Sequence, residues 1–386
     1  MNLFPDEAAR LAAFPVSRSK IFLAHGAVTT LPRAVADAMQ QYVETAAQSH
    51  QEDEQTWHDI KATRIAAGEL IGAFADEIAL LGPTSLGLSL FANGLDWKAG
   101  DEVVCYADDY PANVYPWVDL RRHGVIVHLL RPEQPGEITL ELLDSVLTER
   151  TRLVALASAH FFSGYRIDVA TIGEHLHRRG ILFAVDAIQT VGAFPFDATH
   201  VDFLSADAHK WMLGPCAIGI VMVKRQHFDR LRPTLLGSWN VYSPGFIAQE
   251  KIRFMPTAQR YEPGVLNFAG IYGMKAGIDL IRGFGIERVA SRLLELKACL
   301  VRELDELGFE IVGPREGPAA HAITTCHHPR ANHAMLHGKL AEAGVVCSLR
   351  QDRAGTSYLR FSPHFYNTEA ELARVADVLR KNTSSG

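Results

Sequence analysis

The chain has 386 residues, of which 48% are hydrophobic and 21% are charged, and its formal net charge is -6. This length and composition are typical of a globular protein with a large core, divided into two domains. Lysine and arginine are dispersed along the chain, so we expect no nucleic-acid binding. The N-terminal residues lack a signal-peptide pattern and no run of about 18 apolar residues follows, which predicts a cytoplasmic protein without a membrane span.

The cysteines give no sign of a disulfide framework or of a metal site. They are widely spaced, contain no CxxC pair and are odd in number: Cys105, Cys216, Cys299, Cys326 and Cys347. Small core residues are therefore the expected role for most of them, and we expect no metal.

The first half of the chain alternates helical and strand patterns. Residues 31–50 and 57–73 carry apolar residues at three- and four-residue spacing, which predicts amphipathic helices. Short apolar runs then begin near residues 77, 101, 125, 151, 181, 202 and 217. Because most of these seven runs are separated by helix-length segments, they predict a seven-stranded, mostly parallel sheet with helices on both faces.

A second, smaller α+β unit is expected after "YEPGVLNFAG", residues 261–270. A long helical segment runs to about residue 307, and short strand patterns such as "HAITTC", "VVCSLR" and "YLRFSP" alternate with helices after it. We therefore predict a large domain over residues 17–262 and a small C-terminal domain over residues 263–386, on which residues 1–16 pack.

Polar residues at the ends of the predicted strands are the first candidates for a site, since ligands of open parallel sheets bind there. Thr84 and Ser85 open a helix after the strand near residue 77, where free N–H groups favour a phosphate, although simple capping is an alternative. Asp186 follows four apolar residues, and a buried carboxylate needs a cation nearby.

The stretch "DAHKWMLGP", residues 207–215, sets Lys210 among apolar and aromatic neighbours. Such a lysine either extends its amine to solvent or is kept desolvated as a nucleophile. His160 and Tyr110 follow two further strands, and each taken singly suits a loop histidine or a packing aromatic. Together, these residues supply what pyridoxal phosphate requires: a phosphate-binding site, a carboxylate for a ring nitrogen, an aromatic ring and a desolvated lysine.

At these residues the chain resembles the class V, fold-type I pyridoxal-phosphate enzymes, which include cysteine desulfurases, selenocysteine lyases, kynureninase and isopenicillin N epimerase. The resemblance covers residues 20 to 380, and its most specific part is "FAVDAIQTVGAFPFDATHVDFLSADAHKWMLGP". It implies that Lys210 forms the Schiff base and moves the α-proton, and that Asp186 pairs with the pyridine nitrogen. It also implies that Arg360 in "YLRFSP" holds the substrate carboxylate.

The resemblance assigns the remaining cofactor contacts as well. It implies that Gln189 and His160 contact the phenolate oxygen or the imine, with His160 among the catalytic residues, and that Tyr110 replaces the stacking histidine of desulfurases. The phosphate and the rest of the pocket would be contacted by Thr84, Ser85, Asp207 and His209.

Three departures from the desulfurase pattern modify these expectations. Cys347 lies in an apolar strand pattern, whereas desulfurases carry a nucleophilic cysteine in a mobile loop. Asp207 stands where desulfurases have a serine, and Val265 stands where many members carry a threonine donated by the partner subunit. The resemblance implies a homodimer with shared active sites, and given these departures we expect its phosphate contacts to be completed by residues of the second subunit such as Ser238, Trp239, Asn240 or Asn267.

Three hypotheses of function follow. The first is an enzyme that acts at the α-carbon of a small amino acid by transamination, elimination or epimerisation through a Schiff base on Lys210. The second is a lyase that mobilises sulfur or selenium without the loop cysteine. The third is a cofactor-binding homologue without activity, which the joint presence of Lys210, Asp186 and Arg360 disfavours.

Overall fold

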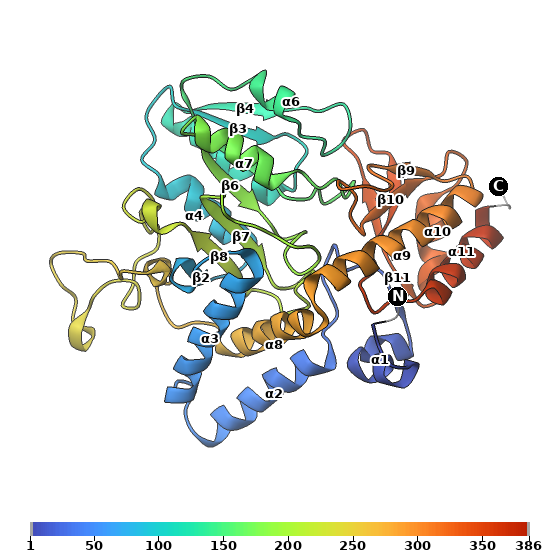
Figure 1. Cartoon of the computed structure of the whole chain (residues 1–386), viewed down its shortest axis with the longest axis horizontal. Coiled ribbons are helices and arrows are strands. Elements are labelled where there is room, and N and C mark those ends of the chain that lie inside the picture. The colour runs from blue at the N-terminus through green and yellow to red at the C-terminus, as the bar shows by residue number, and fades with distance from the viewer. Residues whose placement is uncertain (1–2, 384–386) are drawn as a thin grey trace.

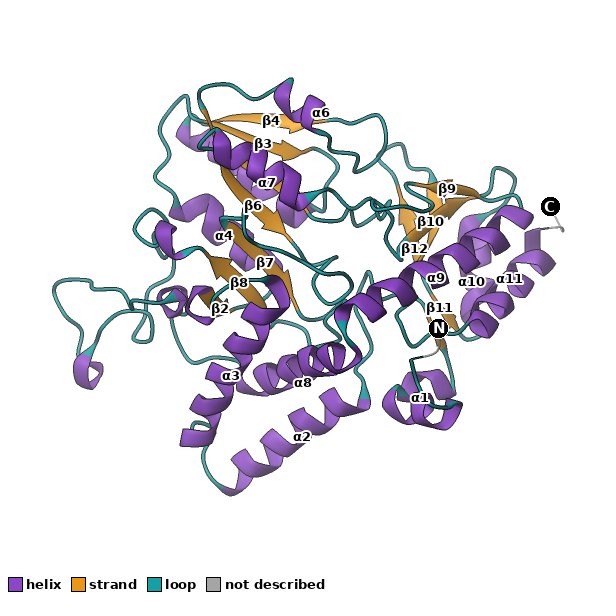
Figure 2. Cartoon of the chain, viewed as in Figure 1, coloured by secondary structure: helices purple, strands orange, loops and turns teal. Residues whose placement is uncertain are grey.

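The structure is a computed structural model that describes residues 3–383. A large sheet with its covering helices fills one side of the molecule, and a smaller sheet with three helices fills the other (Figure 1). Figure 2 shows the two groups of strands as separate orange clusters. No helix in the described part of the chain combines the length and the apolar character that crossing a membrane requires.

The large sheet confirms the seven predicted strands. In space they run in the order β2, β8, β7, β6, β5, β3, β4, and only β8 is antiparallel to its neighbours. Their bounds are β2 (Ile78–Leu80), β3 (Glu102–Tyr106), β4 (Ile126–Leu130), β5 (Thr151–Ala157), β6 (Leu182–Asp186), β7 (Phe203–Asp207) and β8 (Gly219–Val223).

Both faces of this sheet are buried, as the apolar strand runs require. Alternate residues of β5 point to opposite faces, so that Val154 packs on one side and Leu153 on the other. The first face is covered by α3 (Glu54–Ile71), α6 (Leu140–Asp144), α7 (Val169–Arg178) and α8 (Phe268–Phe284). The second face is covered by α4 (Thr84–Gly94) and α5 (Tyr115–Asp119), and α2 (Arg33–Gln48) packs on α8.

The small unit is an antiparallel sheet in the order β12, β13, β10, β9. Its strands are β9 (Glu310–Val312), β10 (Thr324–His327), β12 (Ser348–Gln351) and β13 (Ser357–Phe361), and its helices are α9 (Ile286–Glu306), α10 (His333–Glu342) and α11 (Glu369–Thr383). The run "VVCSLR", predicted as one strand, is divided between β11 (Val345–Val346) and β12, because β11 pairs with β1 (Ile21–Phe22) near the N-terminus.

The long helical segment predicted to reach residue 307 is two helices, which meet at Gly285. This residue has φ of 85°, a value that favours glycine, and it separates α8 from α9. Because α8 packs in the core of the large sheet and α9 in that of the small one, the packing favours a division near Gly285. The boundary between residues 262 and 263 stays a prediction.

The described part of the N-terminal segment contacts the small unit, and residues 1 and 2 of the predicted stretch 1–16 lie outside the described range. Helix α1 (Glu7–Ala13) carries Arg10, whose guanidinium lies 3.0 Å from Glu371 of α11. The ring of Phe14 stacks on Tyr366, with centroids 3.8 Å apart. Figure 1 accordingly shows α1 below the small unit rather than against the large sheet.

Candidate active site

A cavity of about 290 Å³ lies at the carboxyl ends of the central strands, between the large sheet and the small unit. Side chains from β6, from the turn after β7, from the start of α4 and from β12 and β13 line it. Of the predicted site residues, the structure brings seven to its wall: Thr84, Ser85, Tyr110, Asp186, His209, Lys210 and Arg360.

Lys210 is held as a desolvated amine. It follows β7 in a turn, its side chain is 7% exposed, and burial lowers its pKa from 10.5 to about 8 against the opposing charge of Asp186. Its Nζ lies 5.4 Å from the centre of the Tyr110 ring. An amine with this pKa is uncharged in a substantial fraction of molecules near pH 8, so it can act as a nucleophile and as a base.

Asp186 ends β6 and supplies a buried carboxylate to the same cavity. Its Oδ1 accepts a hydrogen bond from the Ile188 N–H at 3.0 Å. Burial raises its pKa to about 6, while the hydrogen bond from Ile188 and the positive charge of Lys210 lower it. A protonated ring nitrogen beside Asp186 would stabilise the charged form of this carboxyl group.

The start of α4 forms the anion-binding end of the cavity. Thr84 and Ser85 stand in its first turn, where N–H groups lack partners within the helix. The Thr84 hydroxyl accepts the Asp207 N–H at 2.8 Å, which fixes the helix on β7. Gly87 allows this close approach, since a Cβ there would lie 2.4 Å from the Ser205 hydroxyl.

Arg360 brings a buried guanidinium from β13 to the cavity. It is 1% exposed, and it donates to the Phe161 carbonyl at 2.5 Å and to the Ser348 hydroxyl at 3.4 Å. Its Nε is buried without a hydrogen-bond partner in the described part of the chain. Burial and the nearby Arg350 lower its pKa to about 9, so a carboxylate at this position would relieve an unfavourable environment.

Three predicted contact residues do not reach the wall of this cavity. The His160 ring contacts the Ser163 hydroxyl and the Asp108 carbonyl, each at 3.0 Å, and it lines a neighbouring cavity. Burial lowers the His160 pKa to about 4, which keeps the ring neutral. Both ring nitrogens are therefore occupied by protein groups, and the catalytic role expected for His160 stays a prediction.

Gln189 and Asp207 lie behind the wall and orient residues that form it. The Gln189 amide donates to the Gly26 carbonyl at 3.1 Å and accepts the Trp211 indole N–H at 2.8 Å. One Asp207 oxygen accepts the Ala208 N–H, and the other lies 3.0 Å from Nδ1 of His209. Neither side chain lines the cavity, because both are engaged by neighbouring groups through contacts that the sequence pattern does not resolve.

Several residues of the wall were not predicted from the sequence, among them Gly26, Phe161 and Arg350. Gly26 and Phe161 belong to loops whose approach depends on the fold. Arg350 did carry a signal, since it ends the apolar pattern "VVCSL" in the same way as Asp186 ends "ILFAV".

Cys347 lies in the core of the small unit, between β11 and β12, and not in the cavity. Burial raises the pKa of its thiol to about 12. At physiological pH this sulfur is therefore a neutral thiol without access to the cavity, which is unlike a reactive cysteine.

These residues fit pyridoxal phosphate. The helix start offers a seat for its phosphate, Asp186 a partner for its ring nitrogen, Lys210 an amine for its aldehyde, and the unpartnered Nε of Arg360 a donor to a substrate carboxylate. The fold and the cavity thus define a fold-type I enzyme that depends on this cofactor.

Comparison with known proteins identifies the family. The family model for aminotransferase class-V matches residues 21–375, and the chain belongs to this family. An uncharacterized aminotransferase of Bacillus subtilis, YcbU, is 26% identical over 99% of both chains, and a probable cysteine desulfurase of Pyrococcus abyssi is 26% identical over 96% of both. The predicted family, its cofactor pyridoxal 5'-phosphate and an enzymatic function at the α-carbon of amino acids are confirmed.

The fold agrees with a solved structure. The apo cysteine desulfurase of Thermococcus onnurineus superposes with a TM-score of 0.91 at 22% identity, and the match covers 100% of both chains. This likeness confirms the predicted fold class.

Proposed function

We propose that the enzyme transaminates, eliminates from or epimerises a small amino acid without a cysteine persulfide on the protein. The observation that carries this proposal is the position of Lys210, Asp186 and Arg360 in one cavity while Cys347 is buried outside it. A chain that used a persulfide would need its thiol within reach of the substrate.

Pyridoxal phosphate, when bound, supplies an aldehyde and an electron-withdrawing ring. We propose that the first turn of α4, with Thr84 and Ser85, holds the phosphate, and that Asp186 keeps the ring nitrogen protonated. Arg360 orients the substrate by its carboxylate. Lys210 provides the amine for the aldehyde carbon, and it accepts or returns the α-proton because its pKa of about 8 lies near neutral pH.

A product screen tests this function. Purified holoenzyme is incubated with each of the twenty amino acids, with and without pyruvate or 2-oxoglutarate. Transamination requires the oxo acid and yields a new amino acid, elimination yields ammonia without it, and epimerisation changes only the chirality. Absence of all three reactions with every amino acid would refute the proposal.

A second candidate is the release of sulfur or selenium from an amino acid, favoured by the curated relatives described as probable cysteine desulfurases. In this chain the reaction would proceed without Cys347. Formation of alanine from cysteine with an added small-molecule thiol, which takes up the sulfur as a persulfide, would support it if Cys347→Ser leaves the rate unchanged. Sulfide formed together with pyruvate and ammonia would instead indicate the elimination of the first candidate.

We further propose a homodimer that completes the phosphate site, supported by exposed apolar residues on a long segment. The segment 233–257 projects from the large unit in Figure 1, and Phe246 and Ile247 within it are 79% and 68% exposed. Val265 is 70% exposed.

We also propose a cytoplasmic location, which is supported by the five unpaired cysteines in the described chain.

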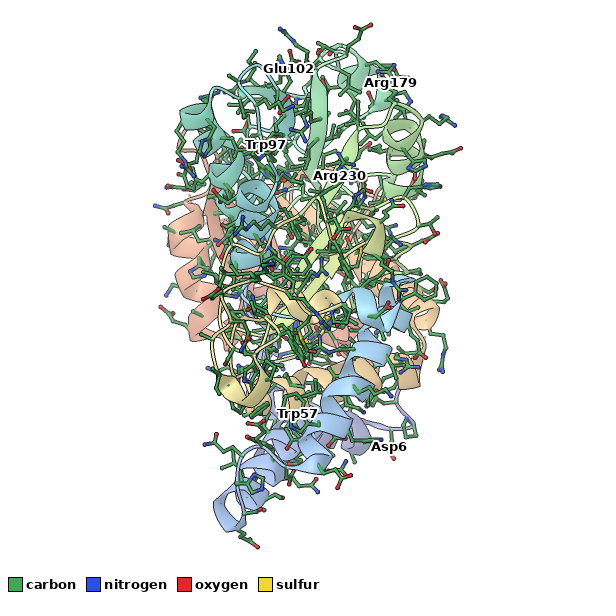
Figure 3. The ribbon with its side chains drawn as sticks, turned by 90° about the vertical axis from the view of Figure 1, so that its left-hand side faces the viewer. Asp6, Trp57, Trp97, Glu102, Arg179 and Arg230 are labelled. Atoms are coloured by element: carbon green, nitrogen blue, oxygen red, sulfur yellow. The ribbon has the colours of Figure 1, made fainter. Side chains whose placement is uncertain are left out.

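Among the residues considered for the partner's phosphate site, Ser238 has the most suitable environment. Asn240 and Asn267 use their side chains within their own chain, to bond Gly237 and to cap α8. Trp239 packs on Trp57, which is labelled in Figure 3, with ring centroids 5.1 Å apart. Ser238 is exposed and polar, so we propose it as the donor to the partner's phosphate.

A further inference from the structure

Two guanidinium groups enter the active-site cavity from the same face of the small sheet. In the antiparallel pair of β12 and β13, Ser348 lies opposite Arg360, and Arg350 lies opposite Tyr358. Arg350 and Arg360 are therefore diagonal neighbours on one face, and both line the cavity. Like charges in this arrangement repel each other unless an anion lies between them.

Neither arginine has an acidic partner among the residues that the structure describes. Arg360 donates to a carbonyl and a hydroxyl, and Nε of Arg350 is buried without a hydrogen bond. Other arginines of the same unit do have carboxylates: Arg292 pairs with Glu369, and Arg353 pairs with Asp108. Arg350 and Arg360 thus line the cavity without a counter-charge from the described residues, which leaves them for an anionic ligand.

The cofactor phosphate does not account for both groups. Its expected seat is the first turn of α4 with Thr84 and Ser85, which belongs to the large unit. One carboxylate, that of a simple amino acid, needs one guanidinium for a bidentate contact. A substrate with one acidic group would therefore leave the second guanidinium without an anionic partner.

We propose that Arg350 binds a second acidic group of the substrate, so that the enzyme acts on amino acids with a carboxylate side chain. This inference rests on the proposed function and names its substrate class. Arg360, which is 1% exposed, takes the α-carboxylate. Arg350 is less buried and lines the cavity together with Tyr110, which is half exposed, so it meets the side-chain carboxylate.

Binding of succinate and butanoate to the holoenzyme tests the proposal by calorimetry. The two probes have the same number of carbons, and succinate has a carboxylate where butanoate has a methyl group. We expect succinate to bind at least about ten times more tightly. Arg350→Met should weaken succinate binding by about ten- to a hundredfold and leave butanoate unchanged, because a charge-assisted contact is lost.

Two further variants control for charge and for folding. Arg350→Lys keeps the charge and should retain part of the preference for succinate. Arg330→Met removes an exposed arginine that does not line the cavity, and it should leave both affinities unchanged. Equal binding of the two probes by the wild type, or loss of cofactor affinity rather than succinate affinity in Arg350→Met, would overturn the proposal.

Kinetics separates this proposal from the proposed function. Wild-type kcat/KM should be higher for L-aspartate or L-glutamate than for L-alanine, and Arg350→Met should reduce that ratio about ten- to a hundredfold. If the enzyme turns over amino acids but Arg350→Met does not reduce this ratio, the assignment of Arg350 is overturned and the proposed function still holds. Succinate binding that depends on Arg350, with no turnover of any amino acid, would overturn the proposed function alone.

Discussion

Two buried lysines allow the chemistry of Lys210 to be separated from the cost of burying an amine. Lys210 lines the cavity, whereas Lys297 lies in α9, is 1% exposed and donates to the Ile323 carbonyl at 2.9 Å. Burial lowers the pKa of each from 10.5 to about 8. At about 1.4 kcal/mol per pH unit, a charged amine at either position costs the folded state about 3 kcal/mol.

The sign of this cost fixes its dependence on pH. Because the folded pKa lies below the unfolded one, the cost is complete below pH 8 and disappears as the pH rises toward 10.5. Replacing Lys297 by methionine removes the cost and also leaves the Ile323 carbonyl unpaired, a penalty of about 1–3 kcal/mol that does not vary with pH. We therefore compare the free energy of unfolding of Lys297→Met with that of wild type at each pH. The value for the variant minus the value for wild type should be about 2 kcal/mol higher at pH 7 than at pH 9.5.

Guanidinium unfolding of the apo enzyme at both pH values measures this difference, and Lys210→Met should change in the same direction. The cofactor then distinguishes the two positions. With added pyridoxal phosphate, Lys297→Met should acquire the visible absorption of wild type, and borohydride reduction should fix the cofactor to the peptide that contains Lys210. A pH-independent stability difference would refute the burial argument, and cofactor retained covalently by Lys210→Met would refute the assignment of Lys210.

Three other predictions follow from the site and the surface. Arg360→Ala should raise KM by about ten- to a hundredfold while the cofactor absorption persists, and an unchanged KM would show that the carboxylate binds elsewhere. Cys347→Ser should change the free energy of unfolding by about 1 kcal/mol and leave turnover within a few fold, and loss of turnover would instead favour a persulfide carrier. Light scattering should give a dimer that Phe246→Asp weakens, and a fully active wild-type monomer at micromolar concentration would contradict a shared site.

The sequence by itself determined the seven strands and the residues that end them. Runs such as "ILFAVDA" are apolar on both faces, and only a strand buried in a covered sheet accommodates this pattern. Asp186 and Lys210 were identifiable for the same reason, since a charged residue in an apolar run is costly without a function or a partner.

The tertiary structure decided which of the polar residues share a cavity. His160 and Gln189 lie in the loops that follow β5 and β6, and their side chains bond the Asp108 and Gly26 carbonyls of other loops, contacts that are distant in sequence. Arg350 meets Arg360 through the pairing of β12 with β13. The division of "VVCSLR" at Cys347 likewise depends on the pairing of β11 with β1, more than 300 residues away along the chain. Such non-local pairing leaves no period in the sequence, so only the folded chain reveals it.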